Sequence, residues 1–554
     1  MAANTRSQDW QKEVEQLKAN SENLERNFDT YMEEIRKSMA EMANQSLTPR
    51  PGSGRIFRHW MTIIGKFLHR PGSILDVVDL NLKGDFDENE VLMVLKLGLM
   101  CLSNEQWGRP IYPVWKLRLI NCPECTPTFG QTTSYNHENT TEEKTNISHI
   151  LFGIGGSAET WSRRRQYCEL WWKPNVTRGH VWLDEEPHEA WPDTSPQYKV
   201  SANTSSFKYT CLYGSRSAVR IARIVKESFE LGSDNVRWFV MGDDDTVFFV
   251  ENLLSVLNKY DYKEMYYIGG NSESVEQDLE HSYTMGYGGG GFAISYPLAK
   301  ELVRILDGCI DRYADLYGSD QKIGGCMTEI GVPVTKELGF HQVDIRGSPY
   351  GLLSAHPLAP LVTLHHLDYV QPIFPNTNRV TSVKKLINTY ESDPSRTLQQ
   401  SFCYDLTRNW SISVSWGYTI QLYPFLMTAK DLNTPLQTFW SSEPFTFNTR
   451  PMSLDPCERP IIYYFDGVEK LDNGSTLTRY RRPHLYRKQC DTENYATAYS
   501  VEGFNVFASI FDPQIWNKAP RRQCCEVING LDQKDGVVHV KIRGCNTWES
   551  VTPP

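Results

Sequence analysis

Three consecutive carboxylates, Asp243, Asp244 and Asp245, stand between two apolar stretches of the sequence. Residues 236–241 have the composition of a buried strand, and residues 246–250 return to an apolar pattern. Adjacent carboxylates in apolar surroundings repel one another and are poorly solvated unless a cation lies among them. Carboxylate oxygens suit Mg²⁺ or Mn²⁺. The triplet therefore predicts a divalent metal site, and a solvated acidic turn is the alternative interpretation.

A glycine turn offers a second place for an anionic ligand. Gly155 lies between a strand-like segment, residues 149–154, and a predicted helix over residues 159–172. The free amide groups of a helix N-terminus can receive a phosphate. Arg164 and Arg165 on this helix could pair with the same phosphate, although an arginine run also suits a solvated helical face. We therefore expect Gly155 and Arg164 to contact a phosphate-bearing cofactor.

Four glycines at residues 288–291 form a further candidate for ligand contact. Glycine lets a ligand approach the backbone closely, so Gly289 and Gly290 are expected to line the cofactor site. A bulge or a tight strand crossing is the alternative.

These residues require a layered α/β fold to position them. From His149 the sequence alternates between short apolar segments and helical segments. Residues 180–183 predict another strand, and residues 218–231 predict an amphipathic helix that stops at Gly232. Ligands of open α/β sheets bind outside the carboxyl ends of strands, which is where the acidic triplet falls.

Several motifs accompany the triplet in a fixed order: residues 239–248 (FVMGDDDTVF), 266–270 (YYIGG), 287–295 (YGGGGFAIS, with Pro297 opening a helix) and 318–327 (GSDQKIGGCM). Together they resemble the Fringe and core 1 galactosyltransferase group, glycosyltransferase family 31. Residues 339–347, 351–357 and 364–368 look more particularly like the plant branch of that family, which is described as a domain of unknown function.

The resemblance covers about residues 146–375 and implies an α/β fold of the GT-A type, in which a mixed sheet with flanking helices binds a nucleotide-sugar. It also implies an inverting β-1,3-glycosyltransferase that takes a sugar from a UDP-sugar held through Mn²⁺ (or Mg²⁺). The metal would neutralise the diphosphate and stabilise it as the leaving group. The acceptor would be a hydroxyl of a glycan or glycoprotein.

The resemblance also implies roles for single residues. Asp243 and Asp245 would contact the ribose and the metal, with Asp245 as the direct metal ligand, and Asp244 would belong to the same donor site. Asp320 matches the acidic residue that acts as catalytic base, because the acceptor hydroxyl must lose its proton while it attacks the anomeric carbon. A helix N-cap is the alternative for Asp320, since Ser319 and Asp320 precede a predicted helix.

A histidine late in the domain is expected as the remaining metal ligand. His365 best matches the family position, in an alternating segment, residues 362–366, that predicts a strand with His366 pointing the other way. His341 and His356 are rivals for this role. A histidine in such a strand can also be a core residue without a ligand.

Two features depart from the family. Gln321 stands where the plant branch usually has a second acidic residue. The family is usually anchored in the Golgi by one N-terminal membrane helix, whereas no run here approaches the ~20 apolar residues of such a helix, and no signal peptide is evident. Membrane association and a Golgi location therefore rest on the resemblance.

Composition narrows the class of partner and the compartment. The net charge of -10 excludes a general nucleic-acid binder, which needs a basic surface. Ten of the 13 cysteines follow Tyr135 with no zinc-site spacing, and they indicate disulfides in an oxidising compartment. Cys122 and Cys125 form an isolated CxxC, for which a zinc site is the less favoured interpretation. Glycosylation sequons begin at Asn139, Asn146, Asn175, Asn203, Asn409 and Asn473, which agrees with lumenal exposure.

The N-terminal region has a different character. We expect a helical or coiled-coil-like segment at residues 1–46, a linker and kinase-tail-like fragment at 47–115, and a further linker at 116–145. Part of it, about residues 73–111, resembles the C-terminal fragment of a plant lectin-receptor-type protein kinase. No glycine-rich phosphate loop, HRD or DFG motif precedes it, so it cannot act as a kinase and instead suggests a gene-model fusion or a relic.

After the Fringe-like domain at residues 146–375, residues 376–554 predict a β-rich, cysteine-containing C-terminal module. Exposed aromatics could make this module an acceptor-binding surface, and a structural cap over the catalytic sheet is the blander alternative. Two functions thus remain open. One is the metal-dependent glycosyltransferase, and the other is a non-catalytic nucleotide-sugar- or carbohydrate-binding protein derived from such an enzyme.

Overall fold

The computed structural model describes residues 143–440, 449–483, 490–532 and 536–552. The chain divides into two units, Met1–His137 and Glu138–Pro554, and the elements described below all belong to the second. The expectations for residues 1–115, the kinase-like fragment and the Cys122–Cys125 pair lie outside the described residues.

A mixed seven-stranded sheet forms the centre of the first half, with the strand order β3-β2-β1-β4-β7-β6-β8. Strand β7 alone runs antiparallel to its neighbours β4 and β6, and the other adjacent pairs are parallel. The strands are β1 (Ile150–Gly155), β2 (Gly179–Leu183), β3 (Tyr198–Val200), β4 (Trp238–Asp243), β6 (Tyr267–Gly269), β7 (Phe292–Ser295) and β8 (Val334–Lys336). The predicted mixed sheet with flanking helices is confirmed at this level.

Alternating side chains of the central strands enter two separate cores. In β4, Phe239 and Met241 pack with helices on one face, whereas Trp238 and Val240 pack on the other. The first face is covered by α5 (Ser217–Glu230), α8 (Tyr296–Arg312) and α9 (Ser319–Ile330). The predicted helix over 218–231 is therefore confirmed as α5, and Gly232 follows it with the left-handed φ of 64° that ends such a helix.

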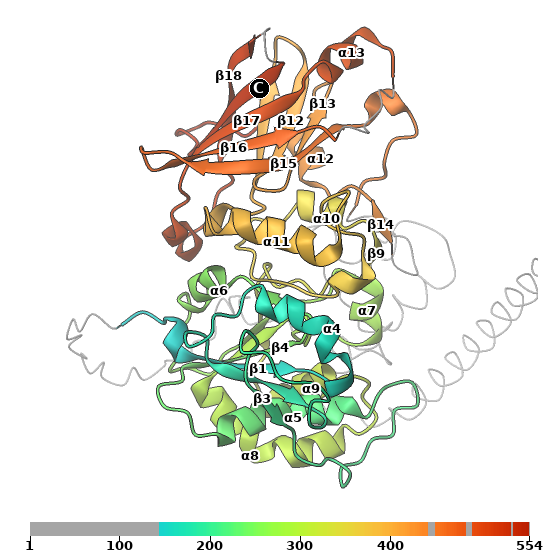
Figure 1. Ribbon diagram of the computed structural model, residues 1–554, viewed down its shortest axis with the longest axis vertical. Helices are drawn as coiled ribbons and strands as arrows, with labels where there is room; N and C mark the ends of the chain where they lie inside the picture. The colour runs from blue at the N-terminus through green and yellow to red at the C-terminus, as the bar shows by residue number, and fades with distance from the viewer. Residues whose placement is uncertain (1–142, 441–448, 484–489, 533–535, 553–554) are drawn as a thin grey trace, which may run out of the picture. The chain divides into compact units, whose positions relative to one another are not determined.

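The other face of the sheet meets α4 (Ala158–Glu169), α6 (Val250–Leu257) and a long segment after β8 (Figure 1). This segment carries short elements that reach the acidic triplet. They are β9 (Arg346–Gly347), α10 (Tyr350–Ser354), β10 (Thr363–Leu364) and the 3₁₀ turn η4 (Leu367–Tyr369). Strand β10 pairs with β5 (Val247–Phe248), directly after the triplet, and α7 (Val275–Glu280) lies between β6 and β7 in the chain.

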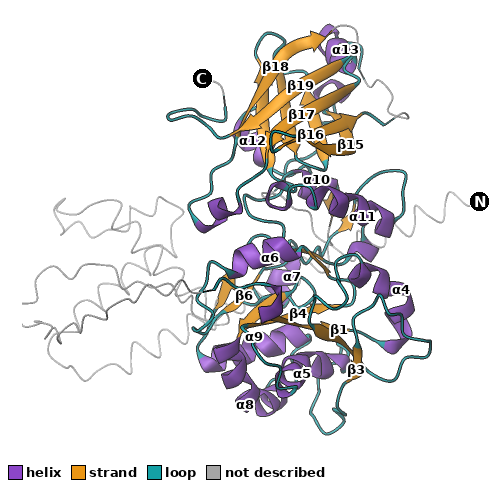
Figure 2. Ribbon diagram, turned by 60° about the vertical axis from the view of Figure 1, so that its left-hand side comes forward, coloured by secondary structure: helices purple, strands orange, loops and turns teal. Residues whose placement is uncertain are grey.

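The second half is a closed eight-stranded barrel, drawn in orange in Figure 2. Its strands, in order around the barrel, are β11 (Gln400–Asp405), β12 (Trp410–Ser415), β13 (Thr419–Tyr423), β15 (Ile461–Lys470), β16 (Ser475–Arg481), β17 (Gly503–Ser509), β19 (Val537–Arg543) and β18 (Cys524–Asp532). Strands β16 and β19 alternate between buried and more exposed residues, as barrel strands with one wet face do. The β-rich C-terminal module is thus confirmed.

Strands β12 and β13 are buried along their whole length because other elements cover their outer face. Phe402 and Tyr423 pack outside the barrel on α12 (Ala429–Asn433), while Ile412 and Val414 join the principal core. The remaining elements are α11 (Arg379–Tyr390), β14 (Phe439–Trp440), α13 (Glu493–Tyr499) and the 3₁₀ turns η3 (Ile147–His149), η5 (Pro394–Arg396), η6 (Pro456–Glu458) and η7 (Pro513–Asn517).

One apolar core runs from the sheet into the barrel. It holds Trp238 and Val240 of β4 as well as Trp410 of β12 and Val540 of β19. A buried ion pair reinforces the junction, because Arg396 lies 3.0 Å from Asp393 and also donates to the carbonyl of Ser509 at the end of β17. The two halves therefore share their hydrophobic stabilisation.

Four disulfides join cysteines of the described segments: Cys309–Cys326, Cys403–Cys525, Cys457–Cys490 and Cys524–Cys545. All six cysteines after residue 400 are thus paired, and Cys168 and Cys211 are free thiols. Among the described residues, no helix combines the length and apolar character needed to cross a membrane.

Candidate active site

The acidic triplet lies where β4 ends at the edge of the sheet. Asp243 is the last residue of β4, and its amide donates to Thr246 Oγ1 at 2.8 Å while its carbonyl accepts from the Thr246 amide at 3.0 Å. This tight turn presents the three side chains differently. The side chain of Asp243 is 32% exposed, whereas that of Asp245 is fully buried.

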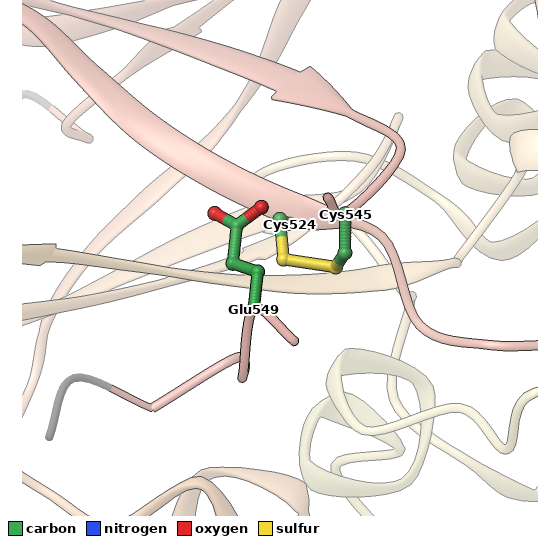
Figure 3. A group of neighbouring side chains, drawn as sticks. All are labelled: Cys524, Cys545 and Glu549. Carbon is green, nitrogen blue, oxygen red and sulfur yellow. A yellow bond between two sulfur atoms is a disulfide. The ribbon is translucent and has the colours of Figure 1, made fainter. Parts of the chain in front are cut away.

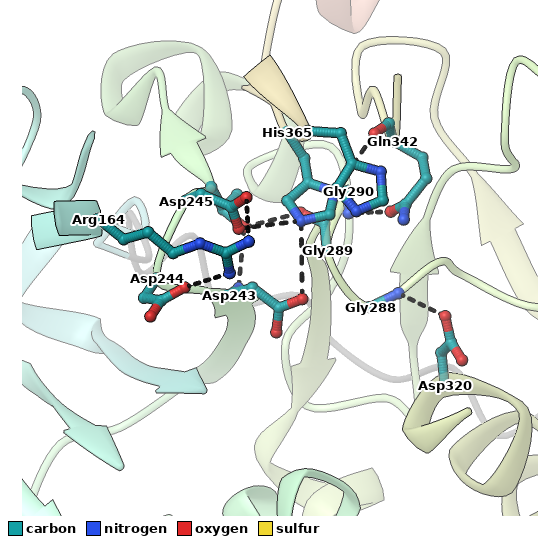
Figure 4. Close-up of polar contacts among 12 residues, drawn as sticks. Arg164, Asp243, Asp244, Asp245, Gly288, Gly289, Gly290, Asp320, Gln342 and His365 are labelled. Atoms are coloured by element: carbon teal, nitrogen blue, oxygen red, sulfur yellow. Dashed lines mark hydrogen bonds and ion pairs between the residues drawn. The ribbon is translucent and has the colours of Figure 1, made fainter. Parts of the chain in front are cut away.

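Asp243, Asp245 and His365 come together, so that one ligand atom of each lies within 4.8 Å of the others (Figure 4). His365 Nε2 is 3.1 Å from Asp245 Oδ1 and 3.7 Å from Asp243 Oδ2. Both carboxylate oxygens of Asp245 are buried and lack a partner with hydrogen-bond geometry, although Oδ1 forms an ion pair with His365 and Oδ2 one with Arg164. A buried carboxylate without well-formed hydrogen bonds is poorly solvated, and a divalent cation held by two carboxylates and an imidazole would satisfy its oxygens. The residues present therefore fit a metal ion.

The proximity of these groups shifts the pKa of each of them. Burial alone would raise the pKa of Asp245, but His365 and Arg164 outweigh it and hold that pKa well below its ordinary value. Burial alone would lower the pKa of His365, and Asp245 and Asp243 instead raise it to about 9. For Asp243, burial and the neighbouring Asp245 raise the pKa, and the lowering effect of His365 does not offset them.

Arg164 and Asp244 form a second pair beside this cluster. Arg164 Nη1 donates to Asp244 Oδ1 at 2.9 Å, and Nη2 lies 3.5 Å from Asp245 Oδ2. Burial and the neighbouring Asp245 raise the pKa of Asp244 to about 7. Arg164 thus faces the triplet, whereas Arg165 pairs with Glu169 one helical turn away. The second arginine belongs to the solvated helical face that the sequence left as an alternative.

The expectation that the glycine turn leaves free amides at the start of α4 is wrong. Asp184, in the loop after β2, accepts from the Ala158 amide at 2.9 Å and from Ser157 Oγ at 3.0 Å. A carboxylate of the chain therefore occupies the place where a phosphate would bind, as the positive end of a helix favours. Gly155 instead packs beside the triplet, where an added Cβ would lie 3.2 Å from Asp243 Oδ1.

The glycine run packs directly against the histidine. A Cβ on Gly289 would lie 2.0 Å from His365 Cε1, so only glycine fits against the imidazole. The carbonyl of Gly289 accepts from Thr246 Oγ1 at 2.7 Å, and the Gly290 amide donates to Gln342 Oε1. Gln342 and Thr246 were not predicted from the sequence, because no spacing connects them with the glycines. The loop is thereby fixed to both sides of the cluster.

Asp320 lies across the same loop, in the first turn of α9. Its Oδ2 accepts from the Gly288 amide at 3.1 Å, and its Oδ1 accepts from the Gln321 amide at 2.9 Å (Figure 4). Burial raises the pKa of Asp320 above its ordinary value despite these hydrogen bonds. The N-cap residue of α9 is Gly318, so the N-cap interpretation of Asp320 is wrong. Asp320 and Asp243 both line a small cavity beneath the loop.

Gln321, the departure from the family pattern, holds the start of α9. Its Oε1 accepts from the amides of Tyr317 and Gly318 at 2.8 and 3.2 Å, and its Nε2 donates to the carbonyl of His281 at 2.8 Å. These bonds satisfy backbone groups next to Asp320.

The other histidines occupy separate positions. The strand ends at Leu364, and His366 adopts a left-handed φ of 52°, which places its ring centroid 3.8 Å from that of His365. The expectation that His366 points the other way is therefore wrong. His341 and His356 hydrogen-bond each other at 2.9 Å, and His341 also contacts Glu273 at 2.8 Å, so neither belongs to the Asp243–Asp245 cluster.

Among the described residues, Cys524, Cys545 and Glu549 also lie close together. Figure 3 shows that the two sulfurs form a disulfide, and Glu549 accepts from both terminal nitrogens of Arg543 at 2.8 Å. These sulfurs are not thiolates and cannot bind a metal as such. The group is a structural clamp of the barrel.

Fold and site together define an α/β protein in which two carboxylates and a histidine at the carboxyl end of a central strand could hold a metal ion. Residues 277–525 match the model of a family described as "Protein of unknown function, DUF604". The matched region contains the glycine run, Asp320 and His365, and it continues into the barrel.

Two curated relatives carry a named activity. The chain is 29% identical over 131 residues to "Beta-1,3-glucosyltransferase" of Homo sapiens, which covers 24% of this chain and 25% of that protein. It is 27% identical over 150 residues to the Mus musculus protein of the same name, which covers 27% of this chain and 29% of that protein. The chain therefore spans between a quarter and a third of the length of these relatives. The similarities support a glycosyltransferase-like family.

Proposed function

We propose that this protein is an inverting, metal-dependent glycosyltransferase that moves a sugar from a UDP-sugar to a hydroxyl of a glycan or glycoprotein, in a β-1,3 linkage. The observation that carries the proposal is the convergence of Asp243, Asp245 and His365 around the buried oxygens of Asp245, which make no well-formed hydrogen bond. The partial similarity to enzymes named beta-1,3-glucosyltransferase agrees with this chemistry.

In this proposal Asp243, Asp245 and His365 hold Mn²⁺ or Mg²⁺. When bound, the metal neutralises the diphosphate of the donor and makes UDP a better leaving group. Asp243 is the partly exposed member of the three, so its carboxylate is the one within reach of a donor. Arg164 holds Asp244 and compensates part of the negative charge of the triplet before the donor binds.

Asp320 is the proposed base. Its carboxylate would take the proton of the acceptor hydroxyl as that hydroxyl attacks the anomeric carbon from the side opposite UDP. The Gly288 and Gln321 amides orient the carboxylate, and the raised pKa makes it a stronger base than an ordinary aspartate. Gly288 donates to Asp320, and the next residue, Gly289, packs against His365. One glycine loop therefore contacts both the proposed base and the proposed metal site.

The protein is further proposed to act in the lumen of the secretory pathway, as Golgi glycosyltransferases do. The four disulfides support an oxidising compartment. The sequon asparagines Asn175, Asn203, Asn409 and Asn473 are all exposed, as glycosylation requires.

The test is made with the full chain from a secretory host. UDP binding and UDP release from UDP-glucose, UDP-galactose and UDP-N-acetylglucosamine are measured with Mn²⁺ and with EDTA. Asp245→Ala should abolish metal-dependent UDP binding. Asp320→Asn should leave UDP affinity within about twofold and lower turnover about 10²- to 10⁴-fold.

The exposed aspartates provide matched controls: Asp234→Ala and Asp315→Asn should behave as wild type. Metal-dependent UDP binding without release of UDP, with or without a panel of acceptor glycans, would favour the binding-protein alternative. Absence of metal-dependent UDP binding would refute the proposal.

A further inference from the structure

An open pocket of about 480 Å³ lies beside the metal cluster. Its wall is formed by α7, by the β9 segment, by the turn around Tyr369 and by Trp440 of β14. A volume of this size is within the range of small-molecule sites and accommodates one or two sugar rings. None of the residues proposed above for donor, metal or base lines it, so the pocket is a separate candidate for ligand binding.

Trp440 is the dominant apolar surface of the pocket. Its side chain is 55% exposed, although the neighbouring Phe439 is only 4% exposed and packs into the principal core. The backbone of Trp440 pairs with Arg346 in the β9–β14 ladder, which Figure 1 shows above α7. The indole lies against Gly347, where a Cβ would come within 2.1 Å of Trp440 Cζ3. A rigidly held tryptophan with an open side is a stacking surface for a ligand.

The polar groups of the pocket suit hydroxyls. Asp344 Oδ1 lies 2.7 Å from His366 Nδ1, and Asp344 Oδ2 accepts from Ser272 Oγ at 2.8 Å. Each carboxylate oxygen has two acceptor sites, so Asp344 can accept further hydrogen bonds. Asp344 engages Nδ1 of His366, so Nε2 of the same ring is the nitrogen that can hydrogen-bond a ligand. The pocket thus combines an aromatic surface with hydrogen-bond acceptors, as sugar rings require.

Charge excludes the donor as the occupant. The pocket wall contains the carboxylates Glu276 and Asp344 and one guanidinium, Arg346, which already lies 4.7 Å over the Tyr369 ring. A diphosphate would meet net repulsion here, whereas a neutral polyhydroxylated ring would not.

The position of the pocket links it to the reacting centre. On one side, the ring of His366 lies tilted against that of His365, with their centroids 3.8 Å apart. On another side, α7 begins at the pocket and is followed by His281, whose carbonyl accepts from Gln321 next to Asp320. The pocket therefore borders the metal cluster, and α7 connects its wall to the segment that holds the base.

We propose that this pocket binds a pyranose ring of the acceptor glycan, stacked on Trp440 and hydrogen-bonded through Asp344 and His366. This inference rests on the proposed function only where it identifies the bound glycan as the acceptor. The binding of a neutral sugar can be tested without it. It gives the C-terminal half of the chain, which supplies Trp440, a part in recognising the acceptor.

The experiment uses the full chain with Trp440→Ala, Trp440→Phe and, as matched control, Trp548→Ala, which changes a tryptophan that is 98% exposed elsewhere. The probes are methyl β-D-glucopyranoside, methyl β-D-galactopyranoside, methyl N-acetyl-β-D-glucosaminide and methyl α-L-fucopyranoside. Binding is followed by saturation-transfer NMR in the presence of UDP and Mn²⁺. Transfer to the best probe is followed by UDP release, and melting temperatures report folding.

At least one glycoside should bind the wild type. Trp440→Ala should weaken it about tenfold or more, as loss of a central aromatic contact does, while Trp440→Phe restores much of the affinity and Trp548→Ala changes nothing. The KM for the UDP-sugar and its slow hydrolysis should stay unchanged in Trp440→Ala. Equal glycoside binding by folded Trp440→Ala and wild type overturns the inference, and so does the absence of binding by the wild type.

Failure of the two proposals is distinguishable. If neither the wild type nor any variant releases UDP, but glycoside binding still depends on Trp440, the transferase proposal is refuted and the sugar-pocket proposal stands. If UDP release depends on metal but glycoside binding is unaffected by Trp440→Ala, the sugar-pocket proposal is refuted and the transferase proposal stands.

Discussion

The contact between Gly289 and His365 allows the metal site to be tested without changing any proposed ligand. A Cβ at residue 289 would lie 2.0 Å from His365 Cε1, whereas ordinary van der Waals contact begins at 3.4 Å, so one group must move by about 1.4 Å (3.4 − 2.0). The loop cannot easily retreat, because Thr246 and Gln342 hydrogen-bond Gly289 and Gly290. Gly289→Ala should therefore displace the imidazole.

A displacement of this size far exceeds the tolerance of about 0.2 Å for a metal ligand. We expect Mn²⁺ affinity to fall at least 10- to 100-fold, the range seen when only the groups behind a ligand are changed. For the wild type, Mn²⁺ at 100 times its Kd stabilises the fold by about 2.7 kcal/mol. The unit Glu138–Pro554 has 417 residues (554 − 137), so this corresponds to a rise in Tm of about 3 °C.

The assay is the melting temperature as a function of Mn²⁺ concentration, together with calorimetric titration of Mn²⁺. The matched control is Gly308→Ala in α8, where the nearest atom to an added Cβ is the flexible Arg312 Nη1 at 3.4 Å. Gly308→Ala should keep the full Mn²⁺-dependent rise. Should Gly289→Ala bind Mn²⁺ within twofold of wild type and show the same rise in Tm, His365 would not be a metal ligand and the reasoning would fail.

Two further predictions concern Asp320 and the junction of the two halves. The base must be a carboxylate, so activity should fall on acidification. Because burial raises the pKa of Asp320, this fall should occur above pH 3.8, the ordinary aspartate pKa. A pH profile of kcat/KM whose acidic limb lies at or below 3.8 would contradict the assignment. Asp393→Asn leaves the buried Arg396 guanidinium without its counter-ion and should lower the free energy of unfolding by about 3–5 kcal/mol in urea titrations. The matched change Asp466→Asn, in a half-exposed pair with Arg481, should alter it by less than about 0.5 kcal/mol, and equal effects of the two changes would refute this account.

Much of the sheet and the centre of the site could be predicted because local signals specify them. The apolar run before Asp243 identifies β4, and the spacing of apolar residues in 218–231 identifies α5. The triplet indicates a cation because its surroundings are apolar within the sequence itself. The convergence of Asp243 and Asp245 with His365 agrees with the ligand set that the family resemblance implied.

The failures come from contacts between distant segments. Asp184 caps α4 across 26 residues, and nothing near Gly155 in the sequence reveals that a carboxylate already occupies the helix N-terminus. The alternation rule failed at His366 because β10 ends after Leu364 and the backbone turns left-handed there. Trp440 meets Arg346 only through a short ladder between the two halves, so its position beside the site has no local signature.

The place where the barrel closes, between β11 and β18, affects how the polypeptide folds during synthesis. Strand β11 closes the barrel by pairing with β18, and Cys403 is bonded to Cys525, 122 residues further along. During synthesis β11 therefore cannot complete its pairing until β18 has been made, close to the end of the chain. Until then the apolar surface that the sheet shares with the barrel has no cover. A premature stop before residue 524 would remove β18, β19 and Cys525, so the barrel could not close and part of the shared apolar core would lose its cover.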